Sequence, residues 1–180
     1  MVILGIDPGS SQTGYGIIDA SNHVHGYGLI SLTGDHMVRI QQIYQEITKI
    51  IQEYKPTTCA IEMPVYGNNP QAMLKLGRAQ AAAMLSVLNQ GLSVAQYTPK
   101  MVKRSVTGNG NASKEQVAYM VKSLLKFNTS EEAISHDISD ALAVAVCHQQ
   151  RESTGEKSET PRYSGWSAFV RDNPDRVAQK

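Results

Sequence analysis

The sequence contains few cysteines and few aromatic residues, and it lacks any long apolar run. Its 180 residues include two cysteines, Cys59 and Cys147, and both lie in apolar stretches. Their placement predicts reduced core thiols rather than a disulfide framework or a metal site. No apolar run approaches the roughly 20 residues that cross a bilayer, and no secretory leader precedes the first predicted strand. We therefore expect a cytoplasmic protein that has no membrane partner.

A strong net charge is also absent, because the chain carries 17 basic and 16 acidic residues and a formal charge of +1. The charges are nevertheless unevenly distributed. Residues 1–62 carry three basic and six acidic groups, whereas residues 63–126 carry eight basic groups and one acid. Residues 127–150 carry four acids and no Lys or Arg. A basic middle segment beside acidic ones suits a polyanion-binding surface next to a metal site, although basic helices are often only solvated.

The remaining composition supports one compact domain rather than two. A chain of 180 residues with 41% hydrophobic content can bury one sizeable core and carry an appendage. We expect this domain to cover residues 1–150. A polar linker and an aromatic-containing C-terminal tail then cover residues 151–180. The only Trp falls at 163–170, a segment that we expect to dock onto this domain or onto a partner.

Hydrophobic periodicity and turn residues predict an α/β fold with one mixed sheet. Alternating or continuous apolar runs predict strands, whereas apolar residues spaced by three or four positions predict helices. The predicted strands cover residues 2–7, 14–19, 23–33, 58–62 and 93–97. The predicted helices cover residues 37–54, 70–89, 114–125 and 137–150, with a short helix from Pro99 and a flexible loop at 108–113. Strands followed by alternating helices and strands indicate a single sheet covered on its faces.

Four acidic residues occupy positions where a carboxylate is costly unless it has a role. Asp7 and Glu62 each end a strongly apolar strand. Asp137 and Asp140 are three residues apart, so they share one face of a predicted helix, within its first turn. An acid at the end of a strand is most often a turn residue, and an acid in the first turn of a helix is most often a cap. The sequence pattern alone does not show that the four acids meet in space. Clustered carboxylates are nevertheless the ligands that Mg²⁺ prefers, and two such ions can drive phosphoryl transfer.

Five sequence blocks occur in the order found in one nuclease family. They are GIDPGSSQTGYG (5–16), AIE (60–62), LKLGRAQ (74–80), VKRSVTGNGNASKEQV (102–117) and DISDALAVAVCH (137–148). GIDPG alone is not specific, because ATPases of the actin and Hsp70 type begin with a similar strand and glycine turn. The ordered set resembles the RuvC family of Holliday-junction resolvases, over roughly residues 1–150.

The resemblance implies an RNase H-like fold and a homodimer that makes symmetrical, Mg²⁺-dependent paired nicks in four-way DNA junctions during recombination and repair. It also implies two Mg²⁺ ions per active site, with Mn²⁺ as a substitute, and the RuvA–RuvB branch-migration complex as a partner. The family's four catalytic, metal-binding acids match Asp7, Glu62, Asp137 and Asp140. Basic positions that family members place near the DNA match Lys103 and Lys114.

Several other residues are candidates for a role at the site. After the second acid, many members of the family carry an aromatic residue that can wedge into the junction. Tyr66 is the candidate for that role here; the alternative is that Tyr66 is an ordinary tyrosine in an exposed turn. Lys75 and Arg78 lie in the basic segment and are further candidates for DNA contact. His136 precedes the third acid and could assist a metal or a proton transfer, although a solvent-facing histidine is more common. We expect His148 to be an ordinary residue near a helix end.

The predicted helix at 70–89 has apolar residues on more than one side. One stripe consists of Gly77, Ala81, Met84 and Leu88. Its small residues permit close approach of another helix, and the resemblance implies a dimer interface there. A second stripe suits burial against the chain's own sheet and consists of Met73, Leu76, Ala83 and Val87. Both interpretations can hold at once.

Other functions remain compatible with the residues alone. An RNase H-like nuclease could instead act on structured RNA, and a non-catalytic protein could only bind junctions. An ATP-binding module around Asp7 would need further phosphate-binding loops, and no convincing second loop follows Glu62. Cleavage of a four-way DNA junction, a linear duplex and a folded RNA separates the nuclease hypotheses. Calorimetry with a nucleotide tests the ATP-binding one.

Overall fold

The computed structural model describes residues 1–64, 67, 69–125 and 134–155. Its centre is a five-stranded sheet with the strand order β3-β2-β1-β4-β5. The strands are β1 (Val2–Asp7), β2 (Gln12–Asp19), β3 (Val24–Ser31), β4 (Thr58–Glu62) and β5 (Val94–Tyr97). The first three strands form an antiparallel meander, and β4 and β5 run parallel to β1. The mixed sheet predicted from the sequence is therefore confirmed.

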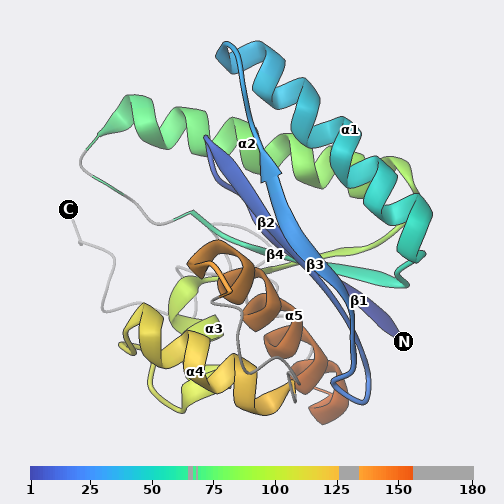
Figure 1. Ribbon diagram of the computed structural model, residues 1–180, viewed down its shortest axis with the longest axis vertical. Helices are drawn as coiled ribbons and strands as arrows, with labels where there is room; N and C mark the ends of the chain where they lie inside the picture. The colour runs from blue at the N-terminus through green and yellow to red at the C-terminus, as the bar shows by residue number, and fades with distance from the viewer. Residues whose placement is uncertain (65–66, 68, 126–133, 156–180) are drawn as a thin grey trace, which may run out of the picture.

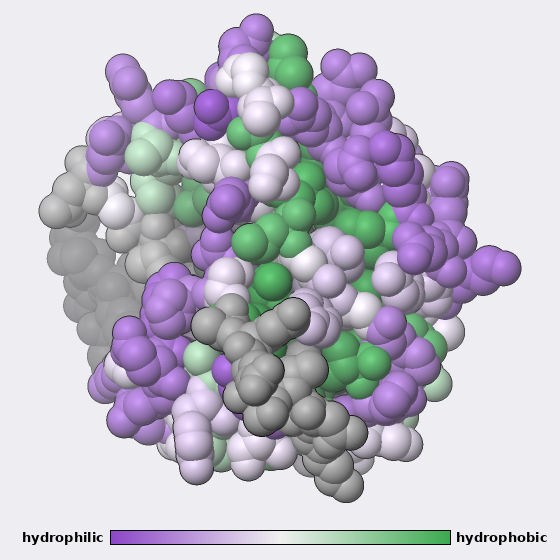
Figure 2. Space-filling model, viewed as in Figure 1, coloured by the Kyte–Doolittle hydropathy of each residue, from purple (hydrophilic) through white to green (hydrophobic). Residues whose placement is uncertain are grey.

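Helices cover the two faces of this sheet (Figure 1). One layer holds α1 (His36–Tyr54) and α2 (Pro70–Asn89), which pack against each other. The other layer holds α3 (Pro99–Thr107), α4 (Lys114–Leu124) and α5 (His136–Thr154). Two hydrophobic cores result, one on each face of the sheet. In the same view, hydrophilic side chains cover much of the outer sides of both layers (Figure 2).

Alternation along β1 determines which side chains face which layer. Leu4 and Ile6 lie in the core beneath α1 and α2, whereas Ile3 lies in the core beneath α5. Because successive side chains of a strand point to opposite faces, Gly5 and Asp7 share the α5 face with Ile3. A Cβ added to Gly5 would lie 2.2 Å from the carbonyl oxygen of Ala141. This glycine therefore lets α5 pack directly on the strand backbone and brings the helix up to Asp7.

The helix α5 is buried on nearly all sides, because it packs against β1, β2 and β4 as well as α3 and α4. Each residue from Ala141 to Cys147 has no measurable exposure. A helix in such a central position needs apolar residues all round rather than one apolar stripe, which explains its sequence ALAVAVC. The helix continues to Thr154, so the first four residues assigned to the predicted linker are helical.

His148 is not an ordinary helix-end residue, and that prediction was wrong. The side chain is 4% exposed, with Nδ1 2.7 Å from the hydroxyl of Tyr97 and Nε2 3.1 Å from the hydroxyl of Thr58. In either neutral tautomer one ring nitrogen donates and the other accepts, so both are satisfied. The imidazole thereby joins α5 to β5 through a buried hydrogen bond and to β4 through a partly buried one.

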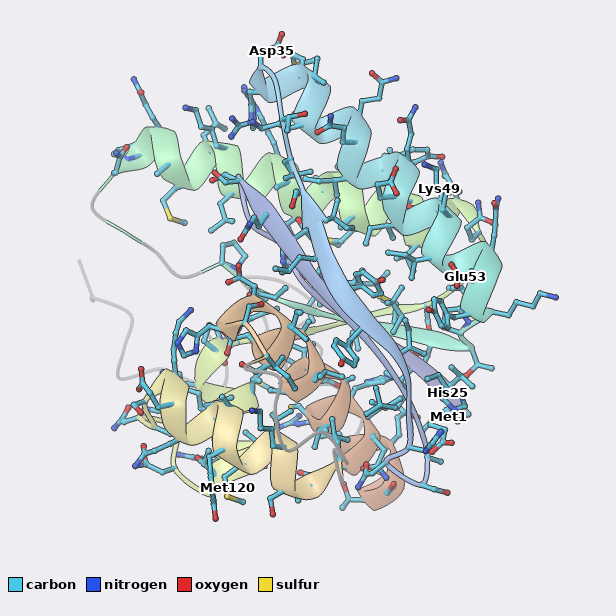
Figure 3. The ribbon with its side chains drawn as sticks, in the orientation of Figure 1. Met1, His25, Asp35, Lys49, Glu53 and Met120 are labelled. Carbon is cyan, nitrogen blue, oxygen red and sulfur yellow. The ribbon has the colours of Figure 1, made fainter. Side chains whose placement is uncertain are left out.

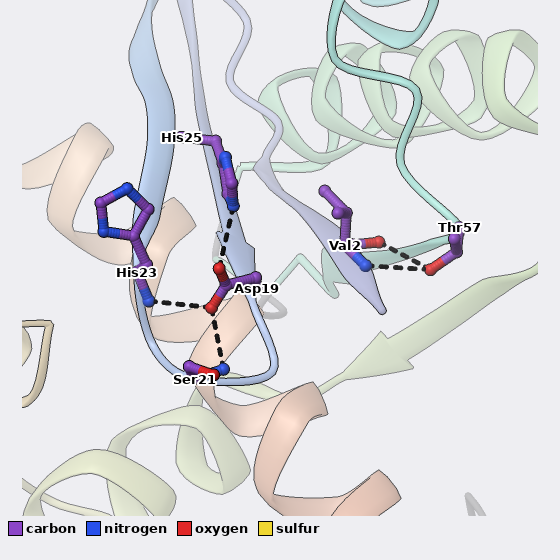
Figure 4. Close-up of polar contacts among 6 residues, drawn as sticks. All are labelled: Val2, Asp19, Ser21, His23, His25 and Thr57. Atoms are coloured by element: carbon purple, nitrogen blue, oxygen red, sulfur yellow. Dashed lines mark hydrogen bonds and ion pairs between the residues drawn. The ribbon is translucent and has the colours of Figure 1, made fainter.

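The end of the sheet where β1 starts is held by further hydrogen bonds (Figure 4). The Asp19 carboxylate accepts from the backbone N–H groups of Ser21 and His23 at 2.8 and 3.1 Å, and His25 Nε2 lies 3.0 Å from its second oxygen. These bonds and His25 hold the pKa of Asp19 below its ordinary value, against the opposing effect of desolvation. Nearby, the Thr57 hydroxyl accepts from Val2 N–H and donates to Val2 C=O. The β2–β3 turn and the first strand are thus fixed at this end.

Local signals predicted most elements to within a few residues. Asp35 caps α1, and Ser113 and Gln116 form a reciprocal capping box at the start of α4, as their spacing indicates. Cys59 and Cys147 are free and buried, as predicted. No helix in the described part of the chain is long and apolar enough to span a membrane. Tyr66 and most of the predicted tail, from residue 156 onward, lie outside the described residues.

Candidate active site

Asp7 and Glu62 lie side by side because β1 and β4 are parallel neighbours. Their register pairs Ile6 with Ile61, so the next residue of each strand is an acid at the same edge of the sheet. Ala60 faces the core beneath α5, and Glu62, two residues later, faces the same way. The two carboxyl groups are joined by a side-chain hydrogen bond. The sequence places both acids at strand ends, and the parallel pairing brings them together.

The start of α5 brings the other two acids to this edge. Gly14 pairs with Asp7 across β1 and β2, and a Cβ added to Gly14 would lie 2.0 Å from the carbonyl oxygen of Asp137. The first turn of α5 therefore rests directly on the strand beside Asp7. Asp140 follows one turn later, and the charges of both helix acids raise the pKa of Asp7. The predicted meeting of the four acids is thus consistent with their positions in the structure.

Burial and mutual repulsion alter the acidity of the two strand-end carboxyls. Desolvation, followed by the charges of Asp140 and Asp137, raises the pKa of Asp7 to about 6. Desolvation and the charges of Asp7 and Asp140 raise the pKa of Glu62 to about 9. Glu62 is therefore protonated at neutral pH and donates its proton to the hydrogen bond with Asp7. Without a bound cation, the site reduces its negative charge by holding a proton.

Two predicted basic residues border the acids. Lys114 Nζ lies 3.2 Å from Asp140 Oδ2. Partial burial opposes the charged form of this lysine, but Asp140 and the neighbouring acids outweigh it and raise the Lys114 pKa. Lys103 Nζ donates a 2.7 Å hydrogen bond to the carbonyl of Ala112. Lys103 thus fixes the loop before α4 and still has N–H groups available for another acceptor.

These residues surround a pocket of about 360 Å³. Its walls include Asp7, Glu62, Asp140, Lys103 and Lys114. Asp137 does not line the pocket directly and acts on it through its charge. His136 is exposed and does not line it either, so its suggested role at a metal has no support from its position. The pocket joins negative and positive groups over a few ångströms, as a site for a metal-bound phosphate requires.

The donor chemistry of the pocket fits a hard divalent cation. All of its acidic groups supply carboxylate oxygens, the ligands of Mg²⁺ and Mn²⁺. As they stand, the Asp7–Glu62 hydrogen bond and the Lys114–Asp140 ion pair partly satisfy these oxygens. No three His, Cys, Asp or Glu side chains within the described ranges are arranged around one metal position. Cation binding therefore requires the side chains to rearrange and the shared proton to leave.

Two of the other predicted DNA-contacting residues, Lys75 and Arg78, do not line the pocket. Lys75 and Arg78 are exposed on α2, whereas Leu76 and Gln80 of the same helix line the pocket. Gln80 was not among the predicted site residues, and its amide donates a 3.3 Å hydrogen bond to the backbone carbonyl of Glu62. Its position at the end of the LKLGRAQ block was the available signal. This bond holds α2 to the C-terminal end of β4.

Comparison with known proteins is consistent with this site. The family model for the crossover junction endodeoxyribonuclease RuvC matches residues 3–148. The chain is 52% identical over 184 aligned positions to RuvC of Salinibacter ruber, covering 99% of this chain and 100% of that one. Thermus thermophilus RuvC has the same fold, with a TM-score of 0.76 and 26% identity over 86% of this chain and 97% of that one. A structure of that enzyme in complex with a Holliday junction substrate also gives a TM-score of 0.76, at 24% identity and similar coverage of 86% and 96%. The predicted RNase H-like fold is confirmed, and the chain belongs to the RuvC family of crossover junction endodeoxyribonucleases.

Proposed function

We propose that this chain resolves Holliday junctions by hydrolysing one phosphodiester bond per active site. The observation that carries the proposal is the convergence of Asp7, Glu62 and Asp140 beside Lys114 in one pocket. Membership of the RuvC family favours a DNA junction over structured RNA as the substrate, and favours catalysis over binding alone. The basic segment 63–126 supplies charge that a phosphate backbone requires.

The acids and lysines divide the chemistry between them. We assign Asp7, Glu62, Asp137 and Asp140 to holding two Mg²⁺ ions, with Mn²⁺ as a substitute. Bound cations lower the pKa of water and neutralise charge on the phosphate and the leaving oxygen. Lys114, at the first turn of α4, is placed to stabilise the additional negative charge of the transition state. Lys103, which also lines the pocket, is assigned to orienting the phosphate.

The proposed enzyme is a homodimer that contacts itself through α2. This helix exposes an apolar stripe, hereafter the α2 stripe, whose members are Leu74, Gly77, Ala81, Leu85 and Leu88. The three leucines are 55%, 53% and 53% exposed, and a Cβ added to Gly77 would meet nothing within 4 Å. Met84, which the sequence interpretation assigned to the outer stripe, packs against the chain's own core instead. Exposed leucines around small residues permit close helix–helix contact.

Ala81→Glu tests the dimer without touching the acids. A charge in the middle of the α2 stripe should shift the mass in analytical ultracentrifugation from two chains to one. Because paired cuts need two active sites, the variant should lose simultaneous nicking of both strands. Gln71→Glu, which adds the same charge to an exposed position in the first turn of α2, is the control. A variant that remains dimeric would refute the assignment of the interface.

The family resemblance also leads us to propose the RuvA–RuvB branch-migration complex as a partner, and a cytoplasmic location. The two free, buried thiols support the proposed location, because cysteines stay reduced in the cytoplasm. The predicted segment 163–170 is the candidate contact for a partner. A pull-down comparing chains with and without residues 156–180 tests whether the tail is needed for that interaction.

A synthetic four-way junction, a linear duplex and a folded RNA, each labelled on separate strands, test the main proposal. We expect symmetrical nicks in the junction with Mg²⁺ or Mn²⁺, and none with EDTA. The duplex and the RNA should stay intact under the same conditions. Equal cleavage of all three substrates, or cleavage in EDTA, would contradict the proposed function.

A further inference from the structure

A second cleft lies on the other side of α3 from the acidic pocket, and its lining is basic. Its volume is about 530 Å³. Lys100 and Arg104 come from α3, and Arg151 comes from the C-terminal half of α5. We propose that this basic cleft binds the phosphate backbone of a junction arm, next to the strand that is cut. The inference rests on the proposed function and extends the DNA-binding surface beyond the predicted residues.

Among the residues that the structure describes, the charges of the basic cleft lack a counter-ion. Its lining contains no Asp or Glu, and its other polar groups are hydroxyls and one amide, from Thr98, Ser105, Gln150 and Thr154. Within the described part of the chain, none of the three cations is within 4.0 Å of a carboxylate, whereas Lys114 and Lys49 are. Three uncompensated cations around one concavity create a positive potential that favours an anion.

The scaffold of the cleft is held in place from both sides. The guanidinium carbon of Arg151 lies 5.7 Å from the centre of the Tyr97 ring, and Tyr97 is itself fixed by the buried hydrogen bond to His148. Lys100 of α3 packs against the loop that follows this helix. A Cβ added to Gly110 of the loop would lie 2.7 Å from Lys100 Cγ, so the aliphatic part of the lysine rests on the loop backbone. These contacts orient Arg151 and Lys100 before any ligand binds, which lowers the entropic cost of binding.

The position of the basic cleft relative to the acids suits an extended polyanion. Val102 and Lys103 face the acidic pocket, and Met101 and Arg104 face the basic cleft. One helix therefore separates the two sites, a distance of about 10 Å. Since a DNA strand advances about 3.4 Å per nucleotide along the duplex axis, this distance corresponds to roughly three base pairs. A duplex with one phosphate beside Asp7 can thus place another phosphate near Arg104.

Lys100→Gln combined with Arg104→Gln tests the proposal. Both residues are exposed, and glutamine preserves the helix. We expect junction affinity to fall about tenfold near 100 mM salt, and the slope of log K against log salt to decrease by about 2. The loss should appear in the half-saturating junction concentration more than in kcat. Unchanged affinity and an unchanged salt slope would overturn the inference.

A matched control removes the same charge from the opposite face of the sheet. Lys49 is an exposed residue of α1 (Figure 3), and Lys55 ends that helix in a left-handed conformation that asparagine tolerates. Lys49→Gln with Lys55→Asn should leave affinity and salt slope near those of the unaltered chain. If both double variants weaken binding equally, net charge rather than the basic cleft accounts for the effect, and the proposal fails.

Charge-neutral methylphosphonates in the DNA locate the contact. Placed one at a time within about eight nucleotides of the cut, they should weaken binding of the unaltered chain at several positions. At the position that contacts the basic cleft, the Lys100/Arg104 variant should show no further loss, because the interaction is already absent. Full additivity at every position would refute the contact. Failure of the unaltered chain to bind or cut the junction would instead refute the proposed function.

Discussion

The two ends of the central sheet differ in how their polar groups are satisfied. Where β1 starts, Asp19 accepts backbone hydrogen bonds and Thr57 bonds to both backbone groups of Val2. His148 links β4 and β5 to α5 with both ring nitrogens satisfied. Where β1 ends, Asp7 and Glu62 are buried beside further negative charge, and burial and repulsion raise the pKa values of both.

This difference separates the groups that stabilise the fold from those that perform chemistry. A polar group with its partners in place stabilises the native state or costs little, whereas buried like charges destabilise it until a cation binds. The parallel register of β1 and β4 forces the acids together despite this cost. The proposed chemistry is therefore concentrated at one end of the sheet, whereas the polar groups at the opposite end have their partners in place. Substitutions at the two ends should consequently have opposite effects.

The largest expected effect comes from Asp7→Asn. The variant should lose at least about a thousandfold in the rate of junction cleavage, because an amide is a poor metal ligand. Junction affinity should change little. Without added metal its melting temperature should rise, by about 2–4 °C per kcal/mol of relieved repulsion. Asp19→Asn is the control from the other end of the sheet, and it should keep its cleavage rate. An Asp7→Asn variant that cuts at the normal rate in Mg²⁺ would contradict the proposal that the four acids hold the catalytic metal ions.

Gly14→Ala should damage both stability and catalysis. The new methyl would overlap the Asp137 carbonyl, so the start of α5 must move away from the sheet. Overpacking of this kind costs about 1–3 kcal/mol, and a displacement near 1 Å can lower a rate about a hundredfold. Urea unfolding and single-turnover cleavage measure the two losses. Gly28→Ala is the matched strand control, because its methyl meets only the ring end of Tyr15; equal damage in both variants would show that the start of α5 is not special.

The sequence predicted most of the fold because the relevant signals are local. A short apolar run marks β1, and Ser113 followed by Gln116 marks the start of α4. The acids were identified because each ends an apolar strand or begins a helix, and because the five ordered blocks resemble one family. A parallel sheet then makes the edge where Asp7 and Glu62 meet predictable.

Contacts between distant segments were not predictable in the same way. Nothing near His148 in the sequence indicates that Tyr97 and Thr58 will satisfy its ring. The basic cleft joins Arg104 to Arg151 only because α3 packs against α5. The exposed side of α2 depends on the rotation of that helix, which a sequence with apolar residues on several sides does not determine.

His148→Asn should reduce stability with little effect on chemistry. Asparagine is too short to reach both hydroxyls. Thr58 keeps its hydrogen bond to the Ser93 hydroxyl, whereas loss of the bond to Tyr97 leaves a buried hydroxyl unsatisfied, at a cost of about 1–3 kcal/mol. The cleavage rate per folded molecule should stay within about threefold of normal. Urea unfolding and cleavage below the unfolding transition give the two quantities. A variant as stable as the unaltered chain would show that this buried pair of hydrogen bonds contributes nothing to the fold.

The smallest expected effect is a pH dependence from the same histidine. Desolvation lowers the His148 pKa, while Glu152 opposes this shift and the Tyr97 hydroxyl faces the ring as a neutral group. The unfolded chain therefore takes up a proton first as the pH falls through about 6.5. The stability that the neutral ring contributes is complete above that pH and is lost progressively below it, toward the folded pKa. Urea unfolding at pH 7.5 and 5.5 should show a larger loss for the unaltered chain than for His148→Asn, which cannot titrate. Equal losses of stability in both chains would mean that His148 accepts a proton in the folded state as readily as in the unfolded chain. Its ring would then be more accessible to water than its hydrogen bonds indicate.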